Sequence, residues 1–471
     1  MCVPCGTSAD LCQSMEFKEA KGFPMGVKVV KFGGTSLADA NQMKKVANII
    51  HSDPERRYVV PSAPGKRFPE DIKVTDMLYD CYDLAEHGVP FQADLNAIQQ
   101  RYRDILTGLE MDENYLDPEF EKIRDAFKSR AGQDYAASRG EYLNAKILSA
   151  YLHFPFVDAA DVIFFQEDGS LDEEKTFKTL RETLAPLDCA VIPGFYGTGY
   201  DGYVKTLSRG GSDVTGSIVA GAIHADLYEN WSDVNGFLVA DPHVVDNPAT
   251  IRTVTYTELR ELSYMGATVL HEEAVFPVRN SGIPINVRNT NEPENPGTMI
   301  VPDSADVDLS RYLITGIAGK KEFTSIHIRK DMMNSKIGYC RDVLDVLAKH
   351  NIPIEHMPSS IDSMTVIVES RYLENGVRDQ ICREISKVAQ PDTLYLENDI
   401  ALIAVVGRGM YRTRGVAARI FAALAHARIN VKMIDQGSSE LNVIVAVKDS
   451  DFEQAVRCIY DMFVNSVEEE D

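Results

Sequence analysis

The stretch V-K-V-V-K-F-G-G-T-S, Val27 to Ser36, joins an apolar, β-branched run directly to a lysine and two adjacent glycines. β-Branched residues favour strands, and a Gly pair after a strand is most often an ordinary turn. A second interpretation is that the glycines let backbone N–H groups approach a phosphate, with Lys31 supplying a positive charge beside it. The stretch matches neither G-x-x-x-x-G-K-[ST] nor G-x-G-x-x-G, so by itself it leaves both interpretations open.

Composition narrows the class of protein. The chain has 471 residues, enough for two or three domains, and its 48 Lys and Arg against 71 Asp and Glu give a net charge of −23. This charge argues against nucleic acid or an anionic membrane as the main partner. No apolar run approaches the roughly 20 residues that span a bilayer, and the first residues lack a signal-peptide pattern. We therefore expect a cytoplasmic protein.

The eight Cys are scattered, which is typical of reduced thiols in a large cytoplasmic chain. Cys2 and Cys5 form a C-x-x-C pair, but no second ligand pair is spaced to complete a zinc site. We expect no protein metal site, and we interpret residues 1–24 as an extension outside the fold.

Short apolar runs alternate with helical patterns from Val27 to about Pro302. The expected strands are Val27–Phe32, Tyr58–Ser62, Ala190–Gly194, Ala225–Trp231 and Ile285–Asn289, and the expected helices are Asn41–Ser52, Lys73–His87, Arg139–Leu152 and Thr257–His271. This alternation predicts an α/β domain, over residues 25–303, with a mostly parallel sheet covered by helices on both faces. Such domains bind ligands at the carboxyl ends of their strands, where Gly33 and Gly34 lie.

The last third of the chain is a repeat. The stretches that start at Gly338 and Gly415 align without a gap, 77 positions apart, and pair Met364-Thr-Val-Ile-Val with Leu441-Asn-Val-Ile-Val. Each copy follows a βαββαβ pattern, but the second copy lacks its last strand. The apolar run Tyr312–Gly319 is unpaired and can supply it. We therefore expect the first unit, 323–397, to be inserted within the second, 312–319 plus 398–466.

Four further stretches resemble the opening one in chemistry. Val60–Gly65 and Ile192–Gly197 follow strands, while Ala137–Glu141 and Thr206–Asp213 are expected to open helices. All four place Gly or Ser where strand ends meet helix starts, which are the anion-binding positions of an α/β sheet. Five such stretches in the expected order favour the phosphate interpretation.

The motifs together resemble those of a known family. K-F-G-G-T-S, S-R-G-E, P-G-F-Y-G, R-G-G-S-D, W-S-D-V-N-G-F-L-V-A-D-P and S-Y-M-G-A-T-V-L-H look like the motifs of aspartate kinases, in the amino acid kinase superfamily, and the duplicated unit is similar to their paired ACT domains. The resemblance covers Val27 to about Val467. It implies that ATP, with Mg²⁺ bridging its terminal phosphates, phosphorylates the side-chain carboxylate of L-aspartate. The product would be 4-phospho-L-aspartate, for lysine, threonine and methionine synthesis.

The resemblance also assigns roles to residues. It implies that Lys31, Gly33, Gly34 and Asp213 are catalytic. Aspartate binding is expected at Ser62, Thr75, Glu141, Arg209, Gly210, Gly211 and Ser212. Nucleotide binding is expected at Lys31, Gly33, Gly34, Ser36, Ser232, Asp233, Gly236, Asp241 and Pro242. The sequence departs from the family pattern at His243, where Arg is usual, and this departure puts one phosphate contact in doubt.

The chemistry of two of these residues can be argued directly. Arg209 offers a fork for the α-carboxylate of an amino acid, and Glu141 offers an anion for its ammonium group. The alternatives are a surface ion pair for Arg209 and a first-turn acid that stabilises its own helix dipole for Glu141. Trp231 is a base-stacking candidate, although a lone Trp that closes a strand is more often core.

The repeated C-terminal units are expected to regulate the enzyme. The resemblance places an amino-acid effector, with lysine favoured and threonine possible, at Ser335, Gly338, Tyr339, Cys340, Pro353, Ile354 and Glu355. Glu355 suits a side-chain ammonium, whereas the matching residue of the second unit is Lys432; the alternative is that Glu355 is a solvated strand residue. We expect a homodimer or homotetramer that assembles through the ACT units. The rival functions are a superfamily kinase acting on glutamate, acetylglutamate or a nucleotide, and an inactive amino-acid sensor.

Overall fold

The structure is a computed structural model that describes residues 26–207, 210–267, 270, 272–305 and 313–465. Its N-terminal part is built on a seven-stranded sheet in the order β3-β2-β1-β6-β8-β9-β7, parallel except for the β8–β9 pair. The strands are β1 (Lys28–Phe32), β2 (Arg56–Pro61), β3 (Ala190–Val191), β6 (Leu227–Ser232), β7 (Thr253–Thr255), β8 (Ile285–Asn289) and β9 (Thr298–Val301); a hairpin of β4 (Tyr196–Thr198) and β5 (Val204–Thr206) lies beside the sheet.

Helices cover both faces of this sheet, as the sequence predicts. One face packs against α1 (Ala40–His51), α2 (Val74–Glu86), α3 (Gln92–Gly108), α4 (Asp117–Lys128) and α5 (Gln133–Leu152); the other packs against α6 (Ala159–Val162), α7 (Glu173–Leu184), α8 (Gly211–Ile223), α9 (Tyr256–Tyr264) and α10 (Glu272–Asn280). Val29 belongs to the cluster that contains α8, and Val30 to the cluster that contains α1. Because side chains alternate along a strand, Lys31 faces α8.

Two predicted helices have different bounds in the structure. Helix α5 begins at Gln133, after Gly132 with a φ of 101°, so 137–141 lies inside the helix and does not open it. The helix predicted over 257–271 ends at Tyr264, because Gly266 adopts a φ of 104° that continues no α-helix, and α10 follows as a separate element.

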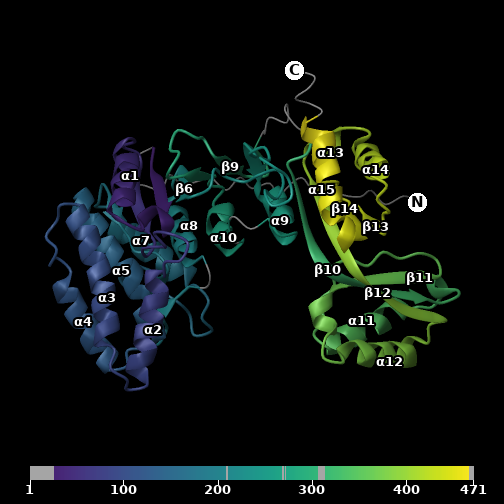
Figure 1. Ribbon diagram of the computed structural model, residues 1–471, viewed down its shortest axis with the longest axis horizontal. Helices are drawn as coiled ribbons and strands as arrows, with labels where there is room; N and C mark the ends of the chain where they lie inside the picture. Colours follow the sequence, from purple (N-terminus) through teal and green to yellow (C-terminus); the bar gives the residue numbers. More distant parts are fainter. Residues whose placement is uncertain (1–25, 208–209, 268–269, 271, 306–312, 466–471) are drawn as a thin grey trace, which may run out of the picture.

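The C-terminal part has one five-stranded antiparallel sheet in the order β11-β10-β12-β14-β13. Its elements are β10 (Gly316–Arg329), α11 (Tyr339–Lys349), β11 (Ser363–Glu369), α12 (Val377–Ala389), β12 (Thr393–Val406), α13 (Gly409–Arg412), α14 (Val416–His426), β13 (Met433–Asp435), β14 (Asn442–Lys448) and α15 (Phe452–Tyr460). Two βαββαβ units share this sheet, because the long strands β10 and β12 run through both of them (Figure 1).

The pairing of β10 with β12 bears on the predicted insertion. Gly316 lies opposite Val406 at one end of the ladder, and Arg329 lies opposite Thr393 at the other. The segment before the first unit therefore contributes a strand beside the second unit, which is the contact that an inserted arrangement requires. The domain boundaries themselves stay a prediction, and both residues 1–24 and Tyr312 lie outside the described residues.

The two parts lie side by side, with α9 at their junction (Figure 1). Gly316 of β10 approaches Leu262 of α9, since a Cβ at this glycine would lie 3.0 Å from the leucine Cδ2. Among the helices of the described ranges, none combines the length and the apolar character needed to cross a bilayer.

Candidate active site

Lys31 and Asp213 form an ion pair at the carboxyl end of β1. The Lys31 ammonium contacts Asp213 Oδ1, and the two side chains are only 8% and 16% exposed. Asp213 lies in the first turn of α8, where the helix dipole stabilises a carboxylate. Asn230 of β6 donates from its Nδ2 to the same oxygen at 2.8 Å. The structure thus joins the two predicted residues and adds a third that sequence reasoning did not identify.

The glycines of the opening stretch bring two loops into backbone contact. A Cβ at Gly34 would lie 2.9 Å from the Ala63 carbonyl oxygen, and one at Gly65 would lie 2.5 Å from the Gly34 carbonyl carbon. The Gly33 amide donates to the Trp231 carbonyl at 2.9 Å, so it is already paired. Among the described residues, the Gly34 amide has no acceptor. Gly34 therefore fits the phosphate interpretation better than Gly33 does.

A third loop meets the start of α8. Gly210 precedes this helix with a φ of 78°, a conformation that favours glycine, and a Cβ at Gly211 would lie 2.6 Å from the Phe195 ring. Ser212 packs closely against Gly194, since a Cβ at this glycine would lie 2.6 Å from the serine Oγ. The N-terminus of α8 is thus a close backbone cradle of the kind that binds anions. Arg209, predicted beside it, lies outside the described residues.

Glu141 is a buried carboxyl group without a full set of partners. Its side chain projects from the interior of α5, which excludes the first-turn explanation. Burial raises the pKa of Glu141 to about 8, against the opposing effect of the Ala63 amide. Within the described chain, Oε2 has no hydrogen-bond partner. A buried carboxyl oxygen without a partner is suited to a cationic ligand group.

Further predicted and unpredicted residues surround Glu141. Thr75 is half-buried, and its Oγ1 would lie 3.7 Å from a Cβ at Gly140. Asn144, one turn along α5, donates to the Ser62 carbonyl at 2.6 Å, while its own Oδ1 lacks a partner in the described part of the chain. Sequence reasoning missed Asn144, although the i, i+3 spacing from Glu141 is a signal that could have indicated it.

Arg101 of α3 binds the backbone of the loop between Ser62 and Thr75. Its guanidinium donates to the carbonyls of Gly65 and Ile72, the latter at 2.7 Å, and lies 3.1 Å from the Asp71 carboxylate. The Asp71 carboxylate also accepts from Arg67, which is the main reason that its pKa lies well below the usual range. A single arginine within a helical pattern carries no sequence signal for this role.

The predicted nucleotide residues divide into two groups. Ser36 is buried, with its Oγ 2.8 Å from Thr290 Oγ1, and a Cβ at Gly33 would lie 4.0 Å from Ser232 Cα. Gly236 has a φ of 94° and packs against Thr298. Exposed residues make up the second group: Asp233, Asp241 and Pro242. No contact among the described residues joins this second group to Lys31.

Trp231 belongs to the core. It is 1% exposed, stacks on Phe32 and donates from Nε1 to Glu229 at 2.8 Å. The guanidinium groups of Arg56 and Arg288 lie 5.2 and 4.5 Å from its ring centre. The core interpretation of this residue is therefore correct.

The predicted effector residues lie on either side of α11, with Ser335, Gly338, Tyr339 and Cys340 at its start and Pro353, Ile354 and Glu355 after its end. Gly338 precedes the helix with a φ of 84°, and the buried Tyr339 has a hydroxyl without a partner in the described chain. Ser335, Pro353 and Ile354 are exposed, and Cys340 is half-buried. Glu355 is not a free solvated residue, because its Oε2 accepts a hydrogen bond of 2.6 Å from the Tyr264 hydroxyl of α9.

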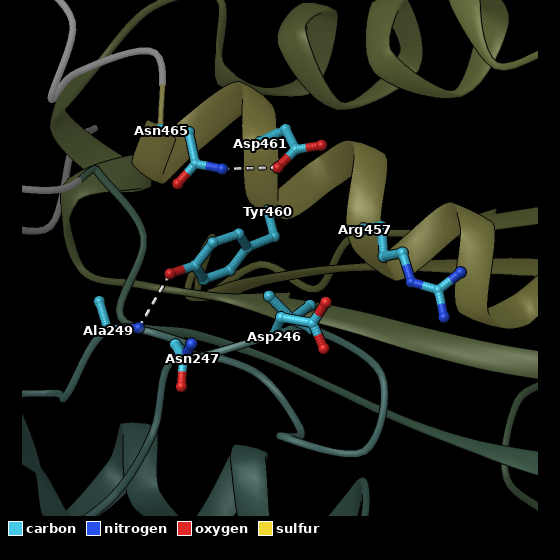
Figure 2. Close-up of a pocket in the computed structure, with 8 residues that line it drawn as sticks. Asp246, Asn247, Ala249, Arg457, Tyr460, Asp461 and Asn465 are labelled. Carbon is cyan, nitrogen blue, oxygen red and sulfur yellow. Dashed lines mark hydrogen bonds between the residues drawn. The ribbon is translucent and has the colours of Figure 1, made fainter.

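The opposite end of the C-terminal part contacts the nucleotide stretch. A cavity of about 390 Å³ lies between the segment 245–249 and α15 (Figure 2). The Tyr460 hydroxyl accepts from the Ala249 amide at 2.8 Å, and Arg457 donates to the Val244 carbonyl at 2.7 Å. Helix α15 therefore fixes the loop that follows Asp241.

Known protein families match both parts of the chain. Residues 26–289 match the model of the amino acid kinase family, and residues 403–463 match that of an ACT domain. The chain is 38% identical to Aspartokinase 3 of Bacillus subtilis (strain 168), over 94% of this chain and 99% of that protein. A solved structure of Clostridium acetobutylicum aspartate kinase is 51% identical, with a TM-score of 0.84 over 93% of this chain and 99% of that one.

E. coli aspartokinase III has been solved in two states. One structure contains aspartate and ADP (R-state), and the other contains lysine and aspartate (T-state). Each is 26% identical to this chain, with a TM-score of 0.69 over 93% of this chain and 99% of the other. From the matched family models, the full-length relatives and the shared fold, the chain belongs to the aspartokinases of the amino acid kinase family.

Proposed function

We propose that this protein phosphorylates the side-chain carboxylate of L-aspartate with ATP and gives 4-phospho-L-aspartate. The observation that carries the proposal is the pairing of two features at one sheet edge: the Lys31–Asp213 ion pair at the start of α8 and the buried, unpartnered Glu141 carboxyl. The first suits a phosphate and the second an amino acid. The aspartate and ADP complex of E. coli aspartokinase III supports the same assignment.

Each substrate group has a partner in this proposal. Glu141 binds the ammonium group of aspartate, Arg209 its α-carboxylate, and Ser62, Thr75 and Ser212 donate or accept hydrogen bonds around it. Lys31, Gly34, Gly210 and Gly211 hold the phosphates, while Asp213 orients Lys31. Since the aspartate carboxylate has an ordinary pKa of about 3.9, it is ionised at neutral pH and needs no general base. The site therefore acts by alignment and charge neutralisation.

Mg²⁺ enters the proposal as part of the nucleotide. Among the described residues, no cluster of three His, Cys, Asp or Glu side chains could hold a metal ion. Asp213 fits a bound magnesium ion in one respect, because its Oδ2 has no partner within the described chain and hard cations prefer oxygen ligands. Mg²⁺ would supply charge neutralisation between the terminal phosphates. Ser232, Asp233, Gly236, Asp241 and Pro242 are proposed for the rest of the nucleotide.

The proposal is tested by an ADP-release assay with aspartate, glutamate, acetylglutamate and UMP in parallel. We expect turnover with aspartate alone. Turnover with another acceptor would favour the rival superfamily kinases, and none with any acceptor would favour the inactive sensor.

We expect alanine substitutions of Lys31 and Arg209 to change different kinetic constants. Lys31→Ala should lower kcat with little change in the aspartate KM, whereas Arg209→Ala should mainly raise that KM, because it removes a contact made in the ground state. An unchanged aspartate KM in Arg209→Ala would refute the proposed α-carboxylate site.

We further propose that lysine inhibits the enzyme by binding at the start of α11. The backbone N–H groups there suit the α-carboxylate, and Glu355 suits the side-chain ammonium. The lysine complex of E. coli aspartokinase III supports a lysine effector. In the second unit, Lys432 occupies the matching position and pairs with Glu397 at 2.6 Å, which disfavours a cationic ligand there.

A further inference from the structure

Asn230 occupies a position where a strand residue is expected to be apolar. It lies on β6 directly opposite Lys31 of β1, and it is 4% exposed. On the same face of β6, Tyr228 is fully buried against the α8 side of the sheet. A buried polar side chain costs free energy unless it is hydrogen-bonded. Among the described residues, the Asn230 amide nitrogen donates to one group, the Asp213 carboxylate.

The geometry gives Asp213 two donors on one oxygen. Both the Lys31 ammonium and the Asn230 amide contact Oδ1. The backbone of the same residue is also fixed, because the Tyr228 hydroxyl donates to the Asp213 carbonyl at 3.0 Å. A lysine side chain has four rotatable carbons and an ammonium group that suits phosphate oxygens. The amide of Asn230, in contrast, projects from a strand and has no such competing ligand.

We propose that Asn230 is a positioning residue that holds the Asp213 carboxylate in place when the Lys31 ammonium turns towards the transferring phosphoryl group. Without this bond, a carboxylate that loses its lysine partner is free to rotate and to draw the ammonium out of line with the transferring phosphoryl group. With the Asn230 hydrogen bond in place, Asp213 Oδ1 stays beside β6. The Lys31 ammonium then moves between a fixed carboxylate and the phosphate. The inference rests on the roles proposed above for Lys31 and Asp213.

The test is the steady-state kinetics of Asn230→Leu, which keeps the side-chain size and removes the donor. We expect kcat to fall about ten- to a hundred-fold, the usual effect of losing a hydrogen bond to a charged group. We expect the KM values for aspartate and ATP to stay within about twofold, because neither ligand contacts Asn230 in this scheme. Asn286→Leu is the matched control. It changes a half-buried asparagine on β8 whose Oδ1 has no partner in the described chain, and it should leave kcat unchanged.

A second variant keeps the test decisive if the leucine variant does not fold. Asn230→Asp has the same shape but places a second carboxylate against Asp213, so its kcat should fall at least as far. A kcat within twofold of wild type in Asn230→Asp, or KM values that rise as much as kcat falls in either variant, would overturn the inference. Lys31→Ala is measured in the same assay. If this variant also keeps wild-type turnover, the roles proposed for Lys31 and Asp213 are wrong as well as the inference about Asn230.

Discussion

At the scale of single residues, burial decides what the candidate site can do. Glu141 was identifiable from its motif, but the motif does not reveal that α5 starts two turns earlier. Its carboxyl is therefore surrounded by protein and its pKa is raised to about 8 by burial. A glutamate at an exposed helix start would be ionised at neutral pH. In the site without substrate, the neutral carboxyl is the more stable form below pH 8.

This protonation links the stability of the free protein to pH. The folded pKa of Glu141 is about 8 and its ordinary value is 4.5, so the folded chain keeps a proton that the unfolded chain loses between these values. The stabilisation is complete below pH 4.5 and is lost as pH rises through 8. Relative to Glu141→Gln, the free energy of unfolding of wild type should fall by up to about 1.4 kcal/mol per pH unit in this window.

Urea unfolding of the ligand-free protein at pH 5, 6, 7 and 8 measures the effect. Glu86→Gln, at an exposed position on α2, is the control and should track wild type at every pH. Parallel curves for wild type and Glu141→Gln would contradict a raised pKa at this carboxyl.

At the scale of elements, the strands were more predictable than the helix ends. The β-branched runs and the 77-residue repeat indicate which segments pair, because both follow from burial on the faces of a sheet. The start of α5 and the end of α9 depend on Gly132 and Gly266, whose positive φ values interrupt a helix and are not revealed by the pattern of apolar residues. Asn230 and Arg101 were missed for a related reason, since the role of each depends on a partner elsewhere along the chain, the Asp213 carboxylate for Asn230 and the carbonyls of Gly65 and Ile72 for Arg101.

Helix α9 makes several hydrogen bonds to the C-terminal part, and one of them lies at the proposed effector residue Glu355. The Tyr264 hydroxyl donates to Glu355, and burial together with this bond raises the pKa of Tyr264. A lysine ammonium that binds Glu355 at Oε2 would have to displace this donor. Tyr264→Phe removes the competitor, so lysine should bind about two- to tenfold more tightly, consistent with the loss of one partly exposed hydrogen bond. Glu355→Ala should bind lysine more weakly than wild type.

Calorimetric titration with lysine compares these variants, and inhibition at millimolar lysine is measured in parallel. Tyr203→Phe changes an exposed tyrosine of the N-terminal part and is the control. Weaker lysine binding in Tyr264→Phe would show that the hydroxyl contributes to the effector site and does not compete for it. Inhibition that is equally strong in Glu355→Ala would refute the site itself.

At the scale of the whole molecule, the shared sheet is covered unequally. In the second unit, Gly316 faces α9 and Gly319 faces Phe452 of α15, so helices lie on both sides of the sheet. In the first unit, α11 and α12 pack on the side that carries Ile326 and Ile328. The other side carries His327, which stacks on Tyr395, and Tyr395 is 57% exposed.

We expect a second copy of the chain to cover this open side, so that the protein is at least a dimer. An exposed sheet face that carries an aromatic side chain can associate with the same face of an identical subunit, and a two-fold contact would pair the two copies in this way. Light scattering at micromolar concentration should give at least twice the mass of one chain, and Tyr395→Lys should shift the protein towards the monomer by placing like charges opposite each other. Tyr203→Lys, at an exposed tyrosine of the N-terminal part, should leave the mass unchanged. A wild-type monomer, with or without lysine, would refute assembly through the ACT units, and an unchanged oligomer in Tyr395→Lys would move the interface to another surface.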